Sequence, residues 1–321
     1  MNTPIRVGLI GLGRHGSRYL HHLLDEETGG QLVAISRQQE AEGRRQAAHH
    51  RLQFFPDYRD LITDPDIQAV LIVTPPELNT PIALKAIAHR KAPLVEKPLA
   101  INSNEGRCIV NAAAQANVPL MTGHTLRYEP VIRKIQGMSA SVGTWQSLSG
   151  TMHLEERHEA QKANAPSHGV LLEFGIHLLD WIRVMLPIQP LTVSANMTSS
   201  SHGTPEEHAE ITLHTSSGLS CQLDIARVKR KRVTHIEVVG AKGRVRGDWT
   251  SGRVQVFEHE ELIAEEMVPP TPTIVPMLKD FFQALQTGQP MPITGIDGLH
   301  AVELAEACHE AAHTGQKVQV E

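Results

Sequence analysis

The chain has 321 residues, of which 40% are hydrophobic and 20% charged, and its formal net charge is −5. This length allows two domains with separate cores. The small negative net charge gives no general attraction to nucleic acid or to anionic membrane surfaces. Because the sequence has no apolar run of ~18 residues and no signal peptide at Met1, we expect a cytoplasmic protein without a membrane partner. Its three dispersed cysteines and nineteen histidines lack metal-ligand spacing, so we predict neither a disulfide framework nor a metal site.

The most informative motif lies at the start of the chain. Ile5–Ile10 has the composition of a buried parallel strand, and Ser17–Leu24 has a helical pattern. The six residues between them are Gly11, Leu12, Gly13, Arg14, His15 and Gly16. This is G-x-G-x-x-G after a strand and before a helix, which is typical of a dinucleotide site. The glycines allow a tight turn, approach of the pyrophosphate and close helix packing, and the helix N-terminus holds the phosphates. The alternative is a purely structural glycine turn.

The pair Ser36-Arg37 follows the second predicted strand and begins twenty residues after Gly16. Proteins that bind NAD usually have Asp or Glu there, because the carboxylate accepts a hydrogen bond from the ribose 2′-OH. A guanidinium can instead bind a 2′-phosphate with two hydrogen bonds. We therefore expect NADP(H) to be the preferred cofactor, with NAD(H) possible. The alternative is that Arg37 is a solvated loop residue.

Strands and helices alternate in the first part of the chain, as in a parallel sheet covered on both faces. The expected strands are Ile5–Ile10, Gln31–Ile35, Gln53–Phe55, Gln68–Thr74, Pro93–Glu96 and Pro119–Gly123. The expected helical segments are Ser17–Leu24, Gln39–His50, Asp57–Ile62, Thr80–His89 and Ser103–Asn117. We predict a doubly wound, dinucleotide-binding α/β domain over residues 1–122.

Two of these strands end in prolines at the sheet edge where ligands bind. Thr74-Pro75 follows one strand, and Lys97-Pro98 follows another. Since proline cannot continue the hydrogen bonding of a sheet, the chain must turn after each of these two strands, at the carboxyl edge of the sheet. A partly buried lysine there has a lowered pKa and is suited to proton transfer. Position alone leaves it equally open that Lys97 is a surface residue in a turn.

The pattern changes after residue 122. The expected strands are Trp145–Glu155, Leu191–Met197, Ala209–Thr215, Leu219–Val228, Thr234–Val239, Gly243–Gly247 and Val254–Phe257. Helices are expected over Gly169–Leu186, Pro276–Leu285 and Ile296–Ala312, and a polar, lid-like loop over Glu156–His168. We predict a domain over 123–321 with a mostly antiparallel open sheet and helices on one face. Its open face is a common place for oligomerisation. We interpret the basic run Lys229–Arg232 as a solvated strand end in preference to an anion site.

The helix Gly169–Leu186 carries three ionisable residues on an otherwise apolar surface up to Trp181. Glu173, His177 and Asp180 fall within ~60° of one another around the helix. Buried ionisable groups are costly unless they are paired or functional. A carboxylate one turn before a histidine can orient its ring and stabilise its charged form. The alternative is a satisfied buried network that only supports the structure.

With these motifs in view, the chain resembles the glucose–fructose oxidoreductase / inositol dehydrogenase / rhizopine-catabolism (Gfo/Idh/MocA-type) family along essentially its whole length. The matching segments are the glycine loop 11–16, Thr74-Pro75, Glu96-Lys97-Pro98-Leu99, Arg127-Tyr128-Glu129-Pro130, residues 169–180 and Gly295–Gly298. Glu96-Lys97-Pro98-Leu99 is the most specific of them.

The resemblance implies a Rossmann domain followed by a C-terminal domain for substrate binding and oligomerisation. It implies reversible hydride transfer between NAD(P) and a hydroxyl carbon of a sugar or cyclitol, in a homodimer or homotetramer joined through the open sheet. By similarity, Lys97 and His177 form the proton-transfer pair beside Glu173. The expected cofactor-binding residues are the glycine loop, Ser36, Arg37, Thr74, Pro75, Asn79, Glu96 and Lys97. The expected substrate-binding residues are Lys97, His124, Arg127, Glu173 and His177.

Two positions depart from the family pattern. Glu173 stands where Asp is usual, and its extra methylene can move the carboxylate by over ~1 Å, which matters for reactive geometry. Asn79 stands where His is frequent. Two other functions therefore stay open beside the oxidoreductase: a non-catalytic dinucleotide sensor, and redox-neutral glycoside cleavage with a tightly held cofactor.

Overall fold

The computed structural model describes residues 3–155, 168–186, 191–201, 203–229 and 231–320. The chain forms two compact units, which we describe separately. Unit 1 comprises Met1–Thr125 and Pro272–Val302, and unit 2 comprises Leu126–Thr271 and Glu303–Glu321. The predicted loop Glu156–His168 lies outside the described residues except for its last position.

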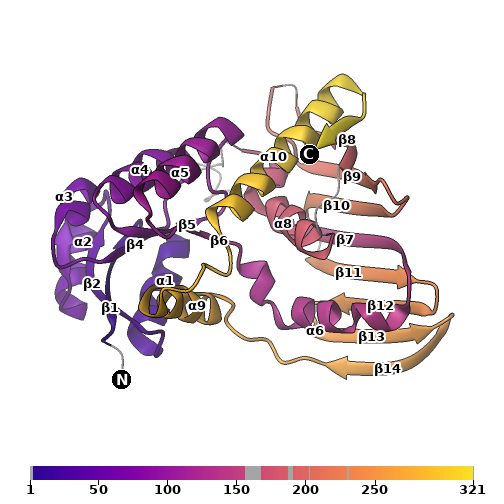
Figure 1. The fold of residues 1–321 in the computed structure, drawn as a ribbon, viewed down its shortest axis with the longest axis horizontal. Helices are drawn as coiled ribbons and strands as arrows, with labels where there is room; N and C mark the ends of the chain where they lie inside the picture. Colours follow the sequence, from indigo (N-terminus) through magenta and orange to yellow (C-terminus); the bar gives the residue numbers. More distant parts are fainter. Residues whose placement is uncertain (1–2, 156–167, 187–190, 202, 230, 321) are drawn as a thin grey trace. The chain divides into compact units, whose positions relative to one another are not determined.

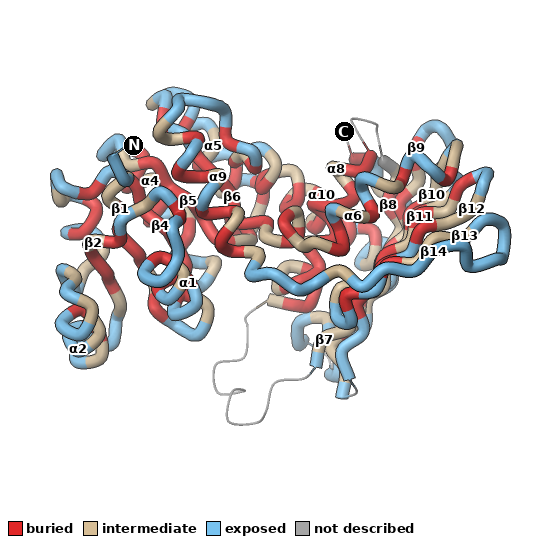
Figure 2. The backbone as a smooth tube through the Cα atoms, turned by 90° about the horizontal axis from the view of Figure 1, so that it is seen from below, coloured by how far each residue is buried: buried red, intermediate tan, exposed pale blue. Residues whose placement is uncertain are grey.

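Unit 1 is built on a six-stranded sheet in which every pair of neighbouring strands is parallel. Its strands are β1 (Ile5–Ile10), β2 (Gly30–Ser36), β3 (Gln53–Phe55), β4 (Ala69–Ile72), β5 (Ala92–Glu96) and β6 (Met121–Gly123). They are ordered β3-β2-β1-β4-β5-β6. This is the order of the dinucleotide-binding fold, and it confirms the predicted fold class. The central strands β4 and β5 are buried throughout, as Figure 2 shows.

Helices lie on both sides of this sheet (Figure 1). They are α1 (Arg14–Asp25), α2 (Glu40–His50), α3 (Tyr58–Thr63), α4 (Asn79–Ala88), α5 (Ser103–Ala116) and α9 (Ile274–Thr287), with a 3₁₀ turn η1 (Pro76–Leu78). One apolar core joins the sheet to α3, α4 and α5. Helices α1 and α9 contact each other and strands β1 and β2.

The return of Pro272–Val302 to unit 1 differs from the predicted division into residues 1–122 and 123–321. The physical reason is the fit of α9 against β2. The ring of Phe282 lies where a side chain at Gly30 would be, since a Cβ there would come within 2.3 Å of the ring. Thr122 N donates to Ile293 O at 3.2 Å, which joins β6 to the segment after α9. Residues far apart in sequence therefore complete the first core.

Unit 2 contains a nine-stranded sheet in the order β14-β13-β12-β11-β7-β10-β9-β8-β15. The strands are β7 (Trp145–Glu155), β8 (Leu191–Thr198), β9 (His208–Thr215), β10 (Ser220–Val228), β11 (Val233–Gly240), β12 (Gly243–Asp248), β13 (Arg253–Glu258), β14 (Glu261–Met267) and β15 (Val318–Val320). Only β7 and β10 pair in parallel among these strands, so the sheet is mostly antiparallel, as predicted.

Burial alternates along the central strands of this sheet, because one face packs on a core and the other is partly exposed. The helical elements of the core are η2 (Thr125–Tyr128), α6 (Pro130–Met138), η3 (Ser139–Val142), η4 (Leu171–Gly175), α8 (Ile176–Met185) and the later part of α10 (Gly295–Thr314). The sequence reading missed α6, β14 and β15. All seven residues of β14 are exposed, so this strand has no alternating pattern to detect (Figure 2).

Candidate functional site

The glycine loop between β1 and α1 has the geometry that a dinucleotide site requires. Gly11 has φ +93°, and a Cβ there would lie 2.3 Å from Val73 O. A Cβ on Gly16 would lie 1.9 Å from Gly11 O, so only glycine lets α1 approach the loop this closely. A Cβ on Gly13 would meet nothing within 4 Å. The open space at Gly13, next to the N–H groups that begin α1, fits an approaching pyrophosphate.

Glu96 is the centre of a buried network at the carboxyl end of β5. It is 4% exposed. Its Oε1 lies 2.9 Å from His15 Nε2 and accepts a hydrogen bond from the Tyr19 hydroxyl, and its Oε2 accepts from Lys97 N at 3.0 Å. Burial alone would raise the pKa of Glu96, but the hydrogen bond and charge of His15, with the charge of Lys97, hold it below its ordinary value. Burial and the Glu96 charge raise the pKa of Tyr19. The network joins the glycine loop to the Lys97 backbone.

Asn79 fixes the ends of β4 and β5 to each other. It is fully buried, and its Nδ2 donates to Glu96 O at 3.2 Å and to Pro98 O at 2.8 Å. Thr74 Oγ1 donates to Asn79 Oδ1 at 3.0 Å. The amide thus holds the turn that carries Lys97, which is half-buried. Contact of Thr74, Pro75 and Asn79 with a cofactor stays a prediction.

Ser36 ends β2 beside the glycine loop, and Arg37 follows it. Ser36 is 3% exposed, and its carbonyl accepts from Gly11 N at 2.9 Å. The Arg37 guanidinium donates to Gln46 Oε1 at 3.0 Å and to Gln39 Oε1 at 2.6 Å. The Arg37 guanidinium is therefore held in place by hydrogen bonds, and it is not the freely solvated side chain of the alternative interpretation.

Arg127, predicted to bind substrate, forms a bidentate ion pair within unit 2. Its Nε donates to Asp180 Oδ2 at 2.7 Å and its Nη2 to Asp180 Oδ1 at 2.5 Å, and Asp180 is 1% exposed. This pair fixes α8 to η2. His124, the other predicted substrate residue of this stretch, belongs to unit 1 and is fully buried just after β6. Substrate contacts of both residues stay predictions.

The predicted helix Gly169–Leu186 is present, and it opens with the π-helical segment η4 before α8. Such segments are frequent at functional sites. Glu173 lies in η4, and its Oε2 accepts a hydrogen bond from Arg227 Nη2. His177 is half-buried one turn later, in the first turn of α8. Glu173 and Asp180 thus have different arginine partners, and both belong to ion pairs.

Glu206 anchors the start of this helix from a distant loop. Its Oε1 accepts from Leu171 N at 3.1 Å, and its carbonyl accepts from Val170 N at 3.0 Å. His309 Nε2 lies 3.3 Å from the same Oε1. Burial would raise the pKa of Glu206, but the hydrogen bond and charge of His309 and the backbone donor hold it below its ordinary value. A Cβ on Gly169 would lie 1.9 Å from the Glu206 carboxyl carbon, so any larger residue there would displace this carboxylate from Leu171 N and His309.

Sequence reasoning missed Tyr19, Glu206 and Arg227. A signal existed for Arg227, because it continues the core-facing alternation of Leu223 and Ile225 along β10 and places a charge where an apolar residue is expected. Tyr19 and Glu206 carry no comparable signal, since their partners are distant in sequence.

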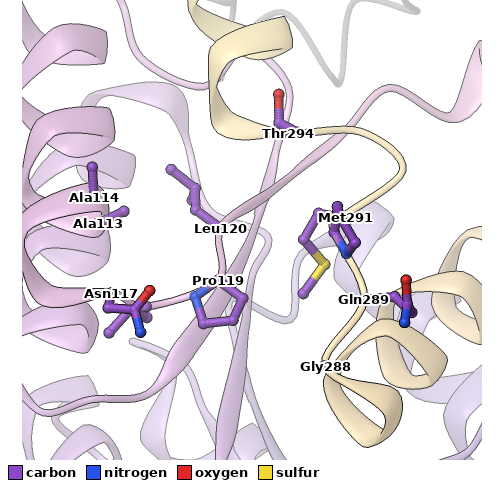
Figure 3. Close-up of a pocket in the computed structure, with 11 residues that line it drawn as sticks. Ala113, Ala114, Asn117, Pro119, Leu120, Gly288, Gln289, Met291 and Thr294 are labelled. Carbon is purple, nitrogen blue, oxygen red and sulfur yellow. The ribbon is translucent and has the colours of Figure 1, made fainter.

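A cavity of about 350 Å³ in unit 1 lies away from the glycine loop. It lies between the end of α5, around Asn117 and Pro119, and the loop carrying Gln289 and Met291 (Figure 3). Asn117 and Pro119 precede β6, whereas the glycine loop follows β1, so the cavity and the loop lie at opposite edges of the parallel sheet. Within the described ranges there is no cluster of three or more His, Cys, Asp or Glu side chains suited to a metal ion. None of the described helices is long and apolar enough to cross a membrane.

Comparisons with known proteins agree with this arrangement. Residues 5–124 match the oxidoreductase family with an NAD-binding Rossmann fold, and residues 150–320 match the C-terminal alpha/beta domain of the same family. A 1,5-anhydro-D-fructose reductase of Ensifer adhaerens is 27% identical over 331 residues, covering 98% of both chains. An inositol 2-dehydrogenase of Salmonella typhimurium is 24% identical, covering 99% of this chain and 97% of its own.

A solved structure has the same fold. It is an oxidoreductase of Agrobacterium radiobacter in complex with NAD⁺, L-tartaric acid and magnesium, with a TM-score of 0.87, 19% identity and 98% coverage of both chains. Together with the fold and the loop geometry, the two family matches define an NAD(P)-dependent oxidoreductase. The chain belongs to the Gfo/Idh/MocA oxidoreductase family, as its motifs indicated.

Proposed function

We propose that the protein is an NADP(H)-dependent oxidoreductase that transfers a hydride between nicotinamide and the hydroxyl or carbonyl carbon of a sugar, sugar derivative or cyclitol. The observation that carries the proposal is the open glycine loop joined through Glu96 to the turn of Lys97. The names of the relatives, a sugar-derivative reductase and an inositol dehydrogenase, support this substrate class.

In the proposed reaction, the cofactor supplies or accepts the hydride when bound. Lys97 and His177 are the proposed proton-transfer residues. In oxidation one of them takes the hydroxyl proton, and in reduction Lys97 donates a proton to the carbonyl oxygen. Glu96 holds the Lys97 backbone through its hydrogen bond to Lys97 N. Glu173 orients His177 from one turn earlier in the helix.

The preference for NADP(H) is supported by Ser36-Arg37 at the end of β2, because neither residue is the acid that accepts from the ribose 2′-OH in NAD-binding proteins. Arg37 donates to the amide oxygens of Gln46 and Gln39, and its Nη1 also lies 3.9 Å from Glu42 Oε1. We expect Arg37→Met to lower the ratio of kcat/KM for NADP to kcat/KM for NAD by about 10- to 100-fold, as charge-assisted hydrogen bonds to phosphate are lost. Arg44→Met, which removes an exposed arginine of α2 that pairs with Glu40, is the control. An unchanged ratio would contradict the preference.

The first test is nucleotide absorbance with NADP and NADPH against sugars, sugar acids, cyclitols and keto-sugars. Lys97→Ala is expected to lower turnover by about 10²- to 10⁴-fold with little change in NADPH affinity. Lys279→Ala, an exposed lysine of α9, is the matched control. NADPH binding without turnover of any compound would count against the oxidoreductase and favour a sensor.

We also propose that the partly exposed face of the unit 2 sheet joins copies of the chain into a homodimer or homotetramer. The alternation of buried and partly exposed residues along β7, β9 and β11 supports this, because the second face has no helical cover from the described part of its unit. Light scattering after size-exclusion chromatography tests the proposal, and a monomer at micromolar concentration would contradict it.

A further inference from the structure

We propose that Arg227 is a positioning residue, which holds Glu173 in one orientation and through it sets the geometry of His177. This inference rests on the proposed function, because it assigns a role within the same reaction. Neither the motifs of the sequence nor the names of the relatives point to Arg227.

The backbone of Arg227 is held on both sides. In the parallel pairing of β10 with β7, Arg227 lies opposite Leu154. On the other side, Arg227 N donates to Glu207 O at 2.8 Å. Its side chain is 15% exposed and follows Leu223 and Ile225 on the buried face of the strand. The backbone that carries this side chain is therefore fixed. Because burying an unpaired charge is costly, the guanidinium requires a partner of opposite charge.

The Arg227 side chain has two partners among the described residues, and both lie in the π-helical segment η4. Its Nη2 donates to Glu173 Oε2, and its guanidinium carbon lies 5.8 Å from the centre of the Phe174 ring. The segment lies directly on β10, since a Cβ on Gly175 would come within 2.7 Å of Ile225 Cδ1. The close contact at Gly175 fixes the distance between η4 and the strand β10. The hydrogen bond from Arg227 fixes the orientation of the Glu173 side chain.

This arrangement has a consequence for His177. Glu173 has three rotatable side-chain bonds and is 18% exposed, so without a partner its carboxylate would sample several positions. The ion pair selects one of these positions, one helical turn before His177. The reach of a glutamate matches the Arg227 guanidinium, whereas an aspartate at position 173 would stop one methylene short of it.

A double-mutant cycle tests this role, with the substrate found in the absorbance panel. We expect Arg227→Met to lower kcat about 10- to 100-fold, the range for a misplaced catalytic group, with KM changed less than about threefold. In a Glu173→Gln background, Arg227→Met should lower kcat less than about twofold further, because the residue acts through Glu173. Arg227→Lys should recover part of the loss, and Glu173→Asp should lose activity.

The control is Arg246→Met, which removes an exposed arginine from β12 and should leave kcat unchanged. An equal loss of kcat on Arg227→Met in both backgrounds would overturn the inference, as would a lowered melting temperature with unchanged kcat. Higher activity of Glu173→Asp than of the parent would also overturn it. Absence of turnover in the parent protein would refute the proposed function and this role together. Turnover with no coupling between the effects of the Arg227 and Glu173 substitutions would refute this role alone.

Discussion

Substitutions at Gly13 and at Gly16 should affect different properties of the glycine loop. We expect a change at Gly13 to affect cofactor binding and a change at Gly16 to affect folding. Gly13 has φ −70° and ψ −169°, which alanine adopts without strain, and a Cβ there would meet no atom of the protein within 4 Å. We expect Gly13→Ala to leave the fold intact and to fill space that the pyrophosphate needs. Gly16→Ala, by contrast, would place a Cβ 1.9 Å from Gly11 O, which is backbone and cannot rotate away.

The expected magnitudes follow from these contacts. Gly13→Ala changes the free energy of unfolding by less than about 1 kcal/mol, because the loss of a favourable N-cap residue is offset by a less flexible unfolded chain. Overpacking against the cofactor costs about 1–3 kcal/mol, which weakens NADPH binding about 5- to 150-fold. Gly16→Ala lowers the free energy of unfolding by a similar or larger amount, since α1 must move away from the loop.

NADPH fluorescence titration and urea unfolding of both variants measure the two effects separately. The expected pattern is a weak-binding, stable Gly13→Ala protein and a destabilised Gly16→Ala protein. If Gly13→Ala bound NADPH within about twofold of the parent protein, the assignment of the open space at Gly13 to the pyrophosphate would be refuted. If Gly16→Ala were as stable as the parent protein, the close approach of α1 would be wrong.

Three further predictions concern the charged groups around the candidate site. Asp180→Asn should lower the free energy of unfolding by about 3–5 kcal/mol in urea, because it leaves the Arg127 guanidinium without its buried anion, and replacing both residues by leucine should cost less than this. Gly169→Ala should destabilise by about 1–3 kcal/mol, and this loss should shrink in a Glu206→Ala background, where the clashing carboxylate is gone; an equal loss in both would contradict the contact. The lowered pKa of Glu96 contributes stability that is present above its ordinary pKa of 4.5 and is lost as the pH falls through its lower folded value, so Glu96→Gln should flatten the fall in melting temperature between about pH 5 and pH 3.

The first sheet could be predicted because its signals are local. Each buried strand is a short apolar run, and each but the last is followed by a predicted helical segment, so a parallel sheet covered by helices is expected. The contact of Phe282 with Gly30 could not be predicted, because residues about 250 positions apart leave no local pattern. The short helix α6 and the exposed strand β14 were missed since neither has a long amphipathic repeat.

For the candidate site, motif reading found the glycine loop and the turn of Lys97, where spacing and chemistry coincide. It also placed Glu173, His177 and Asp180 on one face of the predicted helix. In the structure Glu173 pairs with Arg227 and Asp180 with Arg127, and neither arginine lies in this helix. Glu173 lies in a π-helical segment, which an ideal period of 3.6 residues cannot anticipate.

The late segment Pro272–Val302 has a consequence for synthesis of the protein on the ribosome. A nascent chain that has emerged to Thr125 already contains all six strands of the first sheet, yet it lacks α9 and the residues that bond to β6. The apolar surface beside Gly30 must stay uncovered while the intervening residues of unit 2 are made. At about 5–20 residues per second, this interval lasts roughly 8 to 30 seconds. Unit 1 therefore emerges first but is completed only after residues 126–271 have been made, and until then a chaperone can bind the surface that α9 later covers.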